Sequence, residues 1–251
     1  MGSGSYFVTG LWTPTTLARV HLIVFDIDGT LLRSNEADES CFRSAVAEEF
    51  QLASVSTDWG SYKYSTDSGI LQELLERTRG HGPSPTEVRS FQNRFLSHLE
   101  KFYRVNSGAP QRVPGAREAF EKLQASSEFK VAIATGGWRR SAQFKLQSAG
   151  FECGSIPASF ADDHFAREEI IRFAVDRARE SYKVSEFRST TYLGDGRWDF
   201  WATQKLRIPF VGVTDNRGQD YLSREGVAHL IQDFTDFGSL VKTLQIAIEK
   251  P

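Results

Sequence analysis

The stretch HLIVFDIDGTLL, residues 21–32, places two aspartates one position apart at the end of an apolar run. The run has the near-continuous hydrophobicity of a strand that is covered on both faces. Burying an unpaired carboxylate is costly, and two like charges side by side cost more. The sequence therefore leaves two interpretations open. Asp26 and Asp28 are either solvated acids that cap a helix at the strand end, or a cation belongs beside them.

Similar runs recur along the chain and alternate with amphipathic segments. The expected strands are residues 20–26, 130–135, 189–195, 209–214 and 227–231. The last amphipathic segment, DFGSLVKTLQIAIEK at 236–250, follows the last expected strand. This alternation predicts an α/β fold with a doubly wound, mainly parallel, Rossmann-like sheet.

One long segment interrupts the alternation. Between Ser34 and Arg112 the patterns are helix-like, and no convincing strand occurs: DESCFRSAVAEEF, SGILQELLERT and TEVRSFQNRFLSHLEKFY. We therefore predict an inserted all-helical domain at 34–112, within an α/β core formed by residues 20–33 and 113–251. Residues 1–19 are expected to form a flexible N-terminal leader.

The composition excludes several classes of function. The net charge of −2 over 251 residues gives no electrostatic case for nucleic acid or for an anionic membrane. No apolar stretch approaches the roughly 20 residues that span a bilayer. The two cysteines, Cys41 and Cys153, are too few for a disulfide framework. We expect a soluble cytoplasmic protein, monomeric or homodimeric, without nucleic-acid or membrane partners.

The two aspartates of the first expected strand suit covalent catalysis. On an extended segment, residues two apart share a face and lie about 6.6 Å apart. One carboxylate can then contact a substrate atom while the other reaches an oxygen bonded to that atom. We interpret Asp26 as a candidate nucleophile and Asp28 as a candidate general acid/base. Gly29 permits a sharp exit from the strand and a close backbone approach.

Two further strand ends carry polar groups. Thr135 and the Gly136 N–H, in IATGG, suit phosphate oxygens at a helix N-terminus, although Thr and Gly are also ordinary helix-cap residues. Asp195 and Asp199, in GDGRWD, lie one helical turn apart and can join Asp26 as the hard oxygen ligands that Mg²⁺ prefers. The alternative is a Gly-Asp-Gly turn followed by an aspartate that caps a helix.

Candidate cations are harder to place. Arg167 opens a helix in DDHFAREEII, where it can pair with the nucleophile or with a transferring group. The alternative is a surface arginine paired with its neighbouring glutamates.

Three residues are candidate substrate ligands. Lys63 and Asp67 lie in the aromatic-rich segment DWGSYKYSTDSGI, residues 58–70, which alternatively serves as a hinge or as helix packing. Arg139, just past the Thr135 turn, is placed to meet an anionic substrate tail unless it is simply solvated.

The order of these motifs resembles the haloacid dehalogenase-like (HAD) superfamily, in particular its phosphatases with a helical cap inserted after the first motif. FDIDGTLL and GDGRWD carry the resemblance, which extends from about residue 20 to 248. It implies that Asp26 attacks phosphorus and that Asp28 protonates the leaving group and then activates water. It also implies a Mg²⁺ ion held by the Asp26 carboxylate, the Asp28 carbonyl and Asp195, with Asp199 in support.

By the same resemblance, Thr135 and the Gly136 N–H hold the phosphoryl oxygens. The family usually has lysine where this chain has Arg167, and arginine keeps the charge with a different donor geometry. Lys145 and Lys183 are the alternative candidates for that lysine. We expect a Mg²⁺-dependent phosphatase of a small phosphorylated metabolite. A phosphomutase on the same scaffold and a catalytically weak, phosphate-binding regulatory protein are the alternatives.

Overall fold

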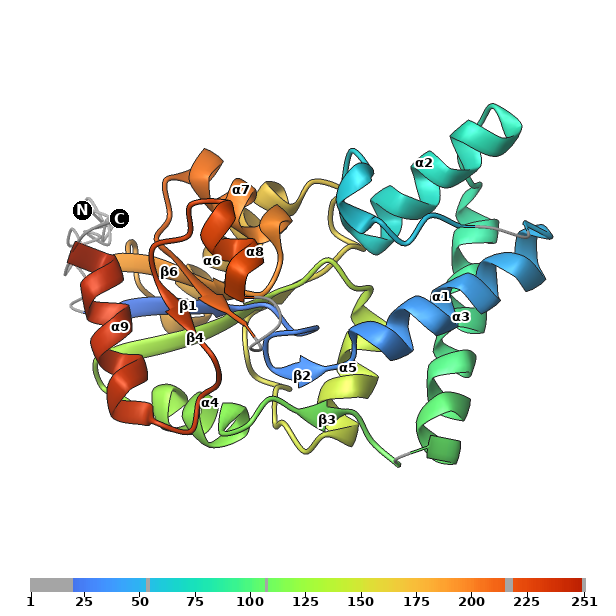
Figure 1. The fold of residues 1–251 in the computed structure, drawn as a ribbon. Coiled ribbons are helices and arrows are strands. Elements are labelled where there is room, and N and C mark those ends of the chain that lie inside the picture. The colour runs from blue at the N-terminus through green and yellow to red at the C-terminus, as the bar shows by residue number, and fades with distance from the viewer. Residues whose placement is uncertain (1–19, 53–54, 107, 215–218, 250–251) are drawn as a thin grey trace, which may run out of the picture.

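A six-stranded parallel sheet forms the centre of the computed structural model, which describes residues 20–52, 55–106, 108–214 and 219–249 (Figure 1). The strand order is β5-β4-β1-β6-β7-β8. The strands are β1 His21–Phe25, β4 Phe129–Ala134, β5 Ala158–Ser159, β6 Ser189–Gly194, β7 Phe210–Val213 and β8 Leu230–Ile231. The predicted doubly wound α/β fold is confirmed, and β5 is an added strand. The leader expected at 1–19 lies outside the described residues.

Helices cover both faces of this sheet, because alternate residues of a strand point to opposite sides. In β1, Ile23 and Phe25 pack in one apolar cluster, whereas Leu22 and Val24 pack in another. The first cluster is completed by α4 (Ala116–Gln124), α5 (Arg139–Ser148) and α9 (Phe237–Glu249). The second is completed by α6 (Arg167–Tyr182), α7 (Arg197–Leu206) and α8 (Gln219–Arg224). This double burial explains why the strands lack polar alternation.

The inserted segment is helical and lies beyond one end of the sheet (Figure 1). It contains α1 (Asn35–Phe50), the 3₁₀ turn η1 (Trp59–Ser61), α2 (Asp67–Arg79) and α3 (Pro85–Asn106). Phe42 of α1 lies at the centre of its apolar cluster, with its ring centroid 5.2 Å from that of Phe91. The same cluster includes the buried Trp138, which precedes α5 of the core. The insert therefore shares its hydrophobic packing with the loop after β4.

A second, two-stranded sheet joins the two ends of the insert. β2 (Leu32–Arg33) pairs antiparallel with β3 (Gln111–Arg112), so that Leu32 is opposite Arg112. The sequence pattern between Ser34 and Arg112 predicts no strand, and β3 corrects that prediction. Two residues are too short to produce a periodic pattern, and β3 forms because its backbone has β2 beside it.

Two further observations concern membrane-spanning helices and cysteines. No helix within the described ranges is both long enough and apolar enough to cross a membrane. Cys41 is buried and Cys153 is partly buried, and both are free thiols.

Candidate active site

The site forms where the direction of chain winding changes. β1 lies between β4 and β6 and pairs in parallel with both, so the carboxyl ends of the three strands are adjacent. Asp26, Thr135 and Asp195 are the residues that follow these three strands. In open α/β sheets this edge is where ligands bind. The topology alone therefore brings together groups that are more than 160 positions apart in the chain.

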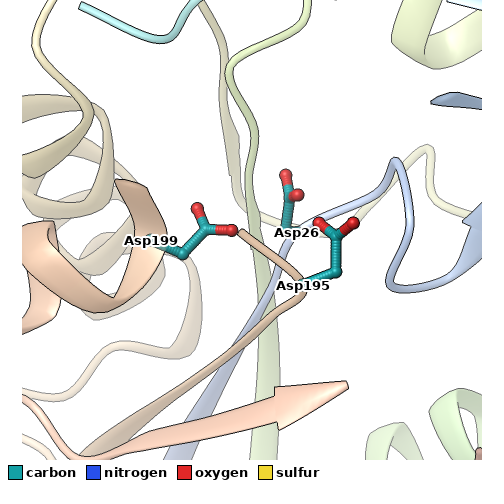
Figure 2. Close-up of side chains that lie close together, drawn as sticks. All are labelled: Asp26, Asp195 and Asp199. Carbon is teal, nitrogen blue, oxygen red and sulfur yellow. The ribbon is translucent and has the colours of Figure 1, made fainter. Parts of the chain in front are cut away.

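Three carboxylates converge at this edge (Figure 2). Asp26, Asp195 and Asp199 each offer an oxygen, and these oxygens lie within 4.8 Å of one another. Asp199 also caps α7, because the Gly196 N–H donates to its Oδ2 at 3.2 Å. Asp199 thus serves both as a cap of α7 and as a member of the carboxylate cluster with Asp26. Gly29 has a φ of +79°, and a Cβ there would lie 1.8 Å from Asp195 Oδ2. Glycine at this position makes room for the cluster.

The cluster is electrostatically unfavourable in the absence of a cation. Burial, reinforced by the charge of Asp199, raises the pKa of Asp26 well above its ordinary value. Burial and the same neighbour raise the pKa of Asp195 to about 7. Three carboxylates whose oxygens lie so close together, with Asp26 and Asp199 buried and Asp195 partly buried, are a donor set that suits a hard divalent cation.

Arg167 supplies a fixed positive charge beside these acids. Its Nη1 lies 3.0 Å from Asp199 Oδ1 and 3.4 Å from Asp26 Oδ1. Its Nη2 donates to the Ser65 carbonyl of the insert at 3.0 Å. The side chain is only 9% exposed, so the surface-arginine alternative does not hold. Its neighbours Glu168 and Glu169 pair instead with Lys205 and Arg172. Lys183, the other candidate on α6, is exposed at the end of that helix.

Asp28 faces a different cation. The Lys145 ammonium of α5 lies 2.5 Å from Asp28 Oδ1 and also contacts Asp38 of α1. The Ser34 hydroxyl donates to the same Oδ1. Burial acts to raise the pKa of Asp28, but the adjacent Lys145 holds it below its ordinary value. Asp28 is therefore paired with a lysine that it shares with Asp38, whereas Asp26 is paired with Arg167.

The loop after β4 connects the site to the insert. The Gly137 N–H donates to Thr135 Oγ1 at 3.2 Å, and the Thr135 side chain is buried. Asp67, the first residue of α2, donates its N–H to the Gly136 carbonyl at 2.8 Å. Its Oδ2 accepts from the Trp138 N–H at 2.9 Å. Burial raises the pKa of Asp67 to about 7. These contacts hold the start of α2 against the candidate phosphate-binding loop.

A cavity of about 130 Å³ opens above the carboxylates. Its polar lining includes Asp26, Asp28, Thr135, Lys145, Arg167 and Asp195. Its apolar lining comes mainly from the insert: Phe42, Trp59, Ile70 and Phe95. The core thus contributes the charged floor, and the insert contributes most of the apolar wall.

Residues 20–207 match the family model described as haloacid dehalogenase-like hydrolase. The chain belongs to this family. It is therefore an enzyme of the hydrolase class, and the resemblance drawn from FDIDGTLL and GDGRWD is confirmed. A comparison with curated proteins gave no match.

Solved structures support the fold of this HAD-like hydrolase. A hydrolase from Pseudomonas syringae is 20% identical, with a TM-score of 0.66 over 88% of this chain and 97% of its own. CbbY from Rhodobacter sphaeroides, in complex with xylulose-(1,5)bisphosphate, is 13% identical, with a TM-score of 0.64 over 86% and 96%. A predicted phosphoglycolate phosphatase from Haemophilus somnus is 17% identical, with a TM-score of 0.55 over 89% and 98%.

Two sequence candidates lie outside the cavity of this hydrolase. Lys63 is exposed, and its ammonium lies 5.0 Å from the ring centroid of Tyr64. Arg139 pairs with Asp163 at 3.4 Å, and its guanidinium lies 4.4 Å from the ring centroid of Phe160. The structure does not bring either side chain to the carboxylates, because each is held by local contacts. Asp67, by contrast, lines the cavity.

Several polar residues at the site were not predicted from the sequence, and three of them, Ser34, Asn35 and Asp38, contact its acids or their lysine. All three come from the start of the insert, and Asn35 Nδ2 donates to Asp195 Oδ2 at 3.0 Å. Proximity in the sequence could have indicated Ser34 and Asp38, because they follow Asp28 by only six and ten positions, just after the first strand. Nothing local indicated that Asn35 would meet Asp195.

Proposed function

We propose that this HAD-like hydrolase is a Mg²⁺-dependent phosphatase that cleaves a small phosphorylated metabolite through an aspartyl-phosphate on Asp26. One observation carries the proposal. The Asp26 carboxylate is buried at a strand end with oxygens of Asp195 and Asp199 within 4.8 Å and the Arg167 guanidinium 3.4 Å away. A buried carboxylate with acids on one side and a cation on the other suits a nucleophile that must receive a dianionic group.

The residues present fit a divalent ion. Asp26 and Asp195 would hold it together with the Asp28 backbone carbonyl, while Asp199 supports the site through Arg167 and the α7 cap. A phosphate charge 4 Å from a carboxylate is opposed by about 4 kcal/mol per unit-charge pair at an effective dielectric of 20. The bound ion would offset this repulsion and stabilise charge on the transferring group.

The protein's own groups then perform two displacements. An Asp26 oxygen bonds to phosphorus as the bond from phosphorus to the leaving oxygen breaks, and Asp28, which must be protonated for this step although Lys145 lowers its pKa, gives its proton to that oxygen. A water next attacks the phosphorus of the aspartyl-phosphate and passes a proton to Asp28. The Asp26 carboxylate is restored and inorganic phosphate leaves. Thr135, the Gly136 N–H and Arg167 would bind the phosphoryl oxygens during both steps.

The cavity supports a small substrate. Its volume of about 130 Å³ leaves room for a phosphoryl group and a short alcohol portion. Phe42, Trp59 and Ile70 offer that portion an apolar wall, with Asp67 as a polar partner. We further propose that the insert acts as a cap over the site, and that the protein is cytoplasmic, monomeric or homodimeric, without nucleic-acid or membrane partners.

The test measures hydrolysis of p-nitrophenyl phosphate with Mg²⁺, with EDTA, and for Asp26→Asn. We expect metal-dependent turnover that the substitution abolishes, because Asn cannot form the acyl phosphate. Asp176→Asn, at an exposed position on α6, is the control and should turn over like the wild type. Turnover that survives in Asp26→Asn would contradict the proposal. Phosphoryl transfer to a second sugar phosphate in place of water would support the mutase alternative, and binding of phosphate without turnover the regulatory one.

A further inference from the structure

A lysine side chain that is 1% exposed lies beneath the site on α5. Lys145 occupies the apolar face of its helix, where its neighbours Ala142 and Leu146 belong to the hydrophobic core. An ammonium is tolerated at such a position only when it is paired and hydrogen-bonded. Its partners are Asp28 and Asp38, and both carboxylates line the cavity. The lysine therefore extends from the core towards the reacting groups.

The two oxygens of Asp28 have different surroundings. Oδ1 receives the Lys145 ammonium at 2.5 Å and the Ser34 hydroxyl. Oδ2 faces the loop after β4, since a Cβ built on Gly137 would lie 3.6 Å from Asp28 Oδ2 and 3.7 Å from Thr135 Oγ1. One oxygen is thus held by two donors, while the other is directed towards the candidate phosphate-binding loop.

Ser34 does not play the usual role of an N-cap serine, and it helps to hold Asp28 instead. It is the N-cap residue of α1, where a serine oxygen ordinarily accepts from a backbone N–H of the first turn. Here its side chain makes no capping hydrogen bond and donates to Asp28 instead. Asp38, one turn into the same helix, contacts the lysine from the other side. The start of the insert therefore helps to fix both Asp28 and its cation.

We propose that Lys145 is a positioning residue that holds Oδ1 of Asp28, so that Oδ2 is presented to the leaving-group oxygen. The proposal rests on the proposed phosphatase function, in which Asp28 transfers the proton. Lys145 does not contact the phosphoryl group in this assignment, and it acts only through Asp28. Asp38 shares the ammonium and anchors it to α1.

The experiment compares two substrates with Lys145→Met, which removes the ammonium at similar side-chain length. Glycerol phosphate has a poor leaving group that needs protonation, whereas 2,4-dinitrophenyl phosphate needs almost none. We expect kcat/KM for glycerol phosphate to fall about 100-fold, within the range of general acid catalysis. The kcat/KM for dinitrophenyl phosphate should change less than about 5-fold, since that step does not use the acid.

A pre-steady-state measurement adds a second readout. Hydrolysis of the aspartyl-phosphate needs Asp28 as a base for either substrate. Lys145→Met should therefore release a burst of dinitrophenolate that equals the enzyme concentration, followed by slow turnover. Lys205→Met, an exposed lysine paired with Glu168, is the matched control and should show wild-type kinetics with both substrates.

Ser34→Ala keeps the test decisive if Lys145→Met does not fold, because it removes the second hold on Oδ1 without leaving a buried carboxylate pair. We expect a loss of about 10-fold with glycerol phosphate alone, equivalent to one hydrogen bond to a charged group. Equal losses with both substrates and no burst would overturn the positioning role while leaving the phosphatase function intact. A wild-type protein that hydrolyses neither substrate would overturn the phosphatase function, and the positioning role with it.

Discussion

The side-chain amide of Asn35 donates a 3.0 Å hydrogen bond to Oδ2 of Asp195, across 160 positions of the chain. Asn35 is the first residue of α1, whereas Asp195 follows β6 of the core. The bond orients one of the two carboxylates that would hold the proposed metal ion. A residue of the insert is therefore part of the outer shell of the proposed metal site.

Asn35→Ala should weaken the response to Mg²⁺, because partners that orient a metal ligand typically contribute 10–100-fold to affinity. We expect the Mg²⁺ concentration for half-maximal activity to rise about 10-fold, with a smaller change at saturating metal. Titration of phosphatase activity with Mg²⁺ measures this shift. Asn93→Ala, an exposed asparagine of α3 that pairs with Arg140, should leave the titration unchanged. An unshifted curve for Asn35→Ala would argue against the outer-shell role.

Arg167→Met should destabilise the metal-free protein, because it leaves Asp26 and Asp199 buried without their cation. Breaking a buried ion pair in this way typically costs about 3–5 kcal/mol of unfolding free energy. Urea denaturation with EDTA measures the loss. Arg167→Lys keeps the charge and should recover most of the stability and activity, although the Nη2 bond to the Ser65 carbonyl is lost. Equal stability of Arg167→Met and wild type would contradict the electrostatic role.

Gly29→Ala isolates the steric requirement of the carboxylate cluster. The new Cβ would meet Asp195 Oδ2 at 1.8 Å, in addition to the strain of a positive φ. Gly80 has a nearly identical φ of +81°, and nothing lies within 4 Å of a Cβ there. Gly80→Ala should therefore cost about 1–2 kcal/mol from backbone strain, and Gly29→Ala about 1–3 kcal/mol more from the clash. Urea unfolding of the two variants provides the comparison, and equal losses would exclude the clash.

Asp67 should make folding stability depend on pH. Burial raises its pKa from the ordinary 3.8 to about 7, so the folded state binds the proton more tightly than the unfolded state. The free energy of unfolding contributed by this group therefore falls as pH rises between about 4 and 7. Asp67→Asn should reduce the loss of stability between pH 5 and pH 8 by at most about 3 kcal/mol.

Urea denaturation of wild type and Asp67→Asn at pH 5 and pH 8 tests this dependence. Asn retains an oxygen that can accept from the Trp138 N–H, so the contact itself is preserved. Asp176→Asn serves as the exposed control and should keep the wild-type pH dependence. Identical pH profiles for wild type and Asp67→Asn would refute the assignment.

Local sequence patterns predicted the sheet because each main strand is a continuous apolar run. The residues that follow adjacent parallel strands lie at the same edge of the sheet. Asp26, Thr135 and Asp195 could be placed together on that basis alone. Arg167 could be proposed because it opens a helix of the same core. β2, β3 and β5 escaped prediction because each has two residues and forms through a neighbouring backbone.

The remaining contacts depend on how the insert packs against the core, which no periodic pattern records. Lys63 and Arg139 have the charges of substrate ligands, but neither residue lines the cavity. The sequence gives one partial indication that Lys145 pairs with buried acids such as Asp28 and Asp38. The lysine shares a helix face with Ala142 and Leu146, and a charged residue at a core position calls for a buried partner.

The short β2–β3 pair would allow the insert to be replaced by a segment from another protein. Because Leu32 is opposite Arg112 and Arg33 is opposite Gln111, a foreign segment spliced between Arg33 and Gln111 would start and finish on neighbouring backbones. The β2–β3 sheet of this protein would then need no rearrangement to receive the new segment. A successful graft would still have to bring an apolar surface to cover Trp138, so donor segments should be chosen by that surface before their length.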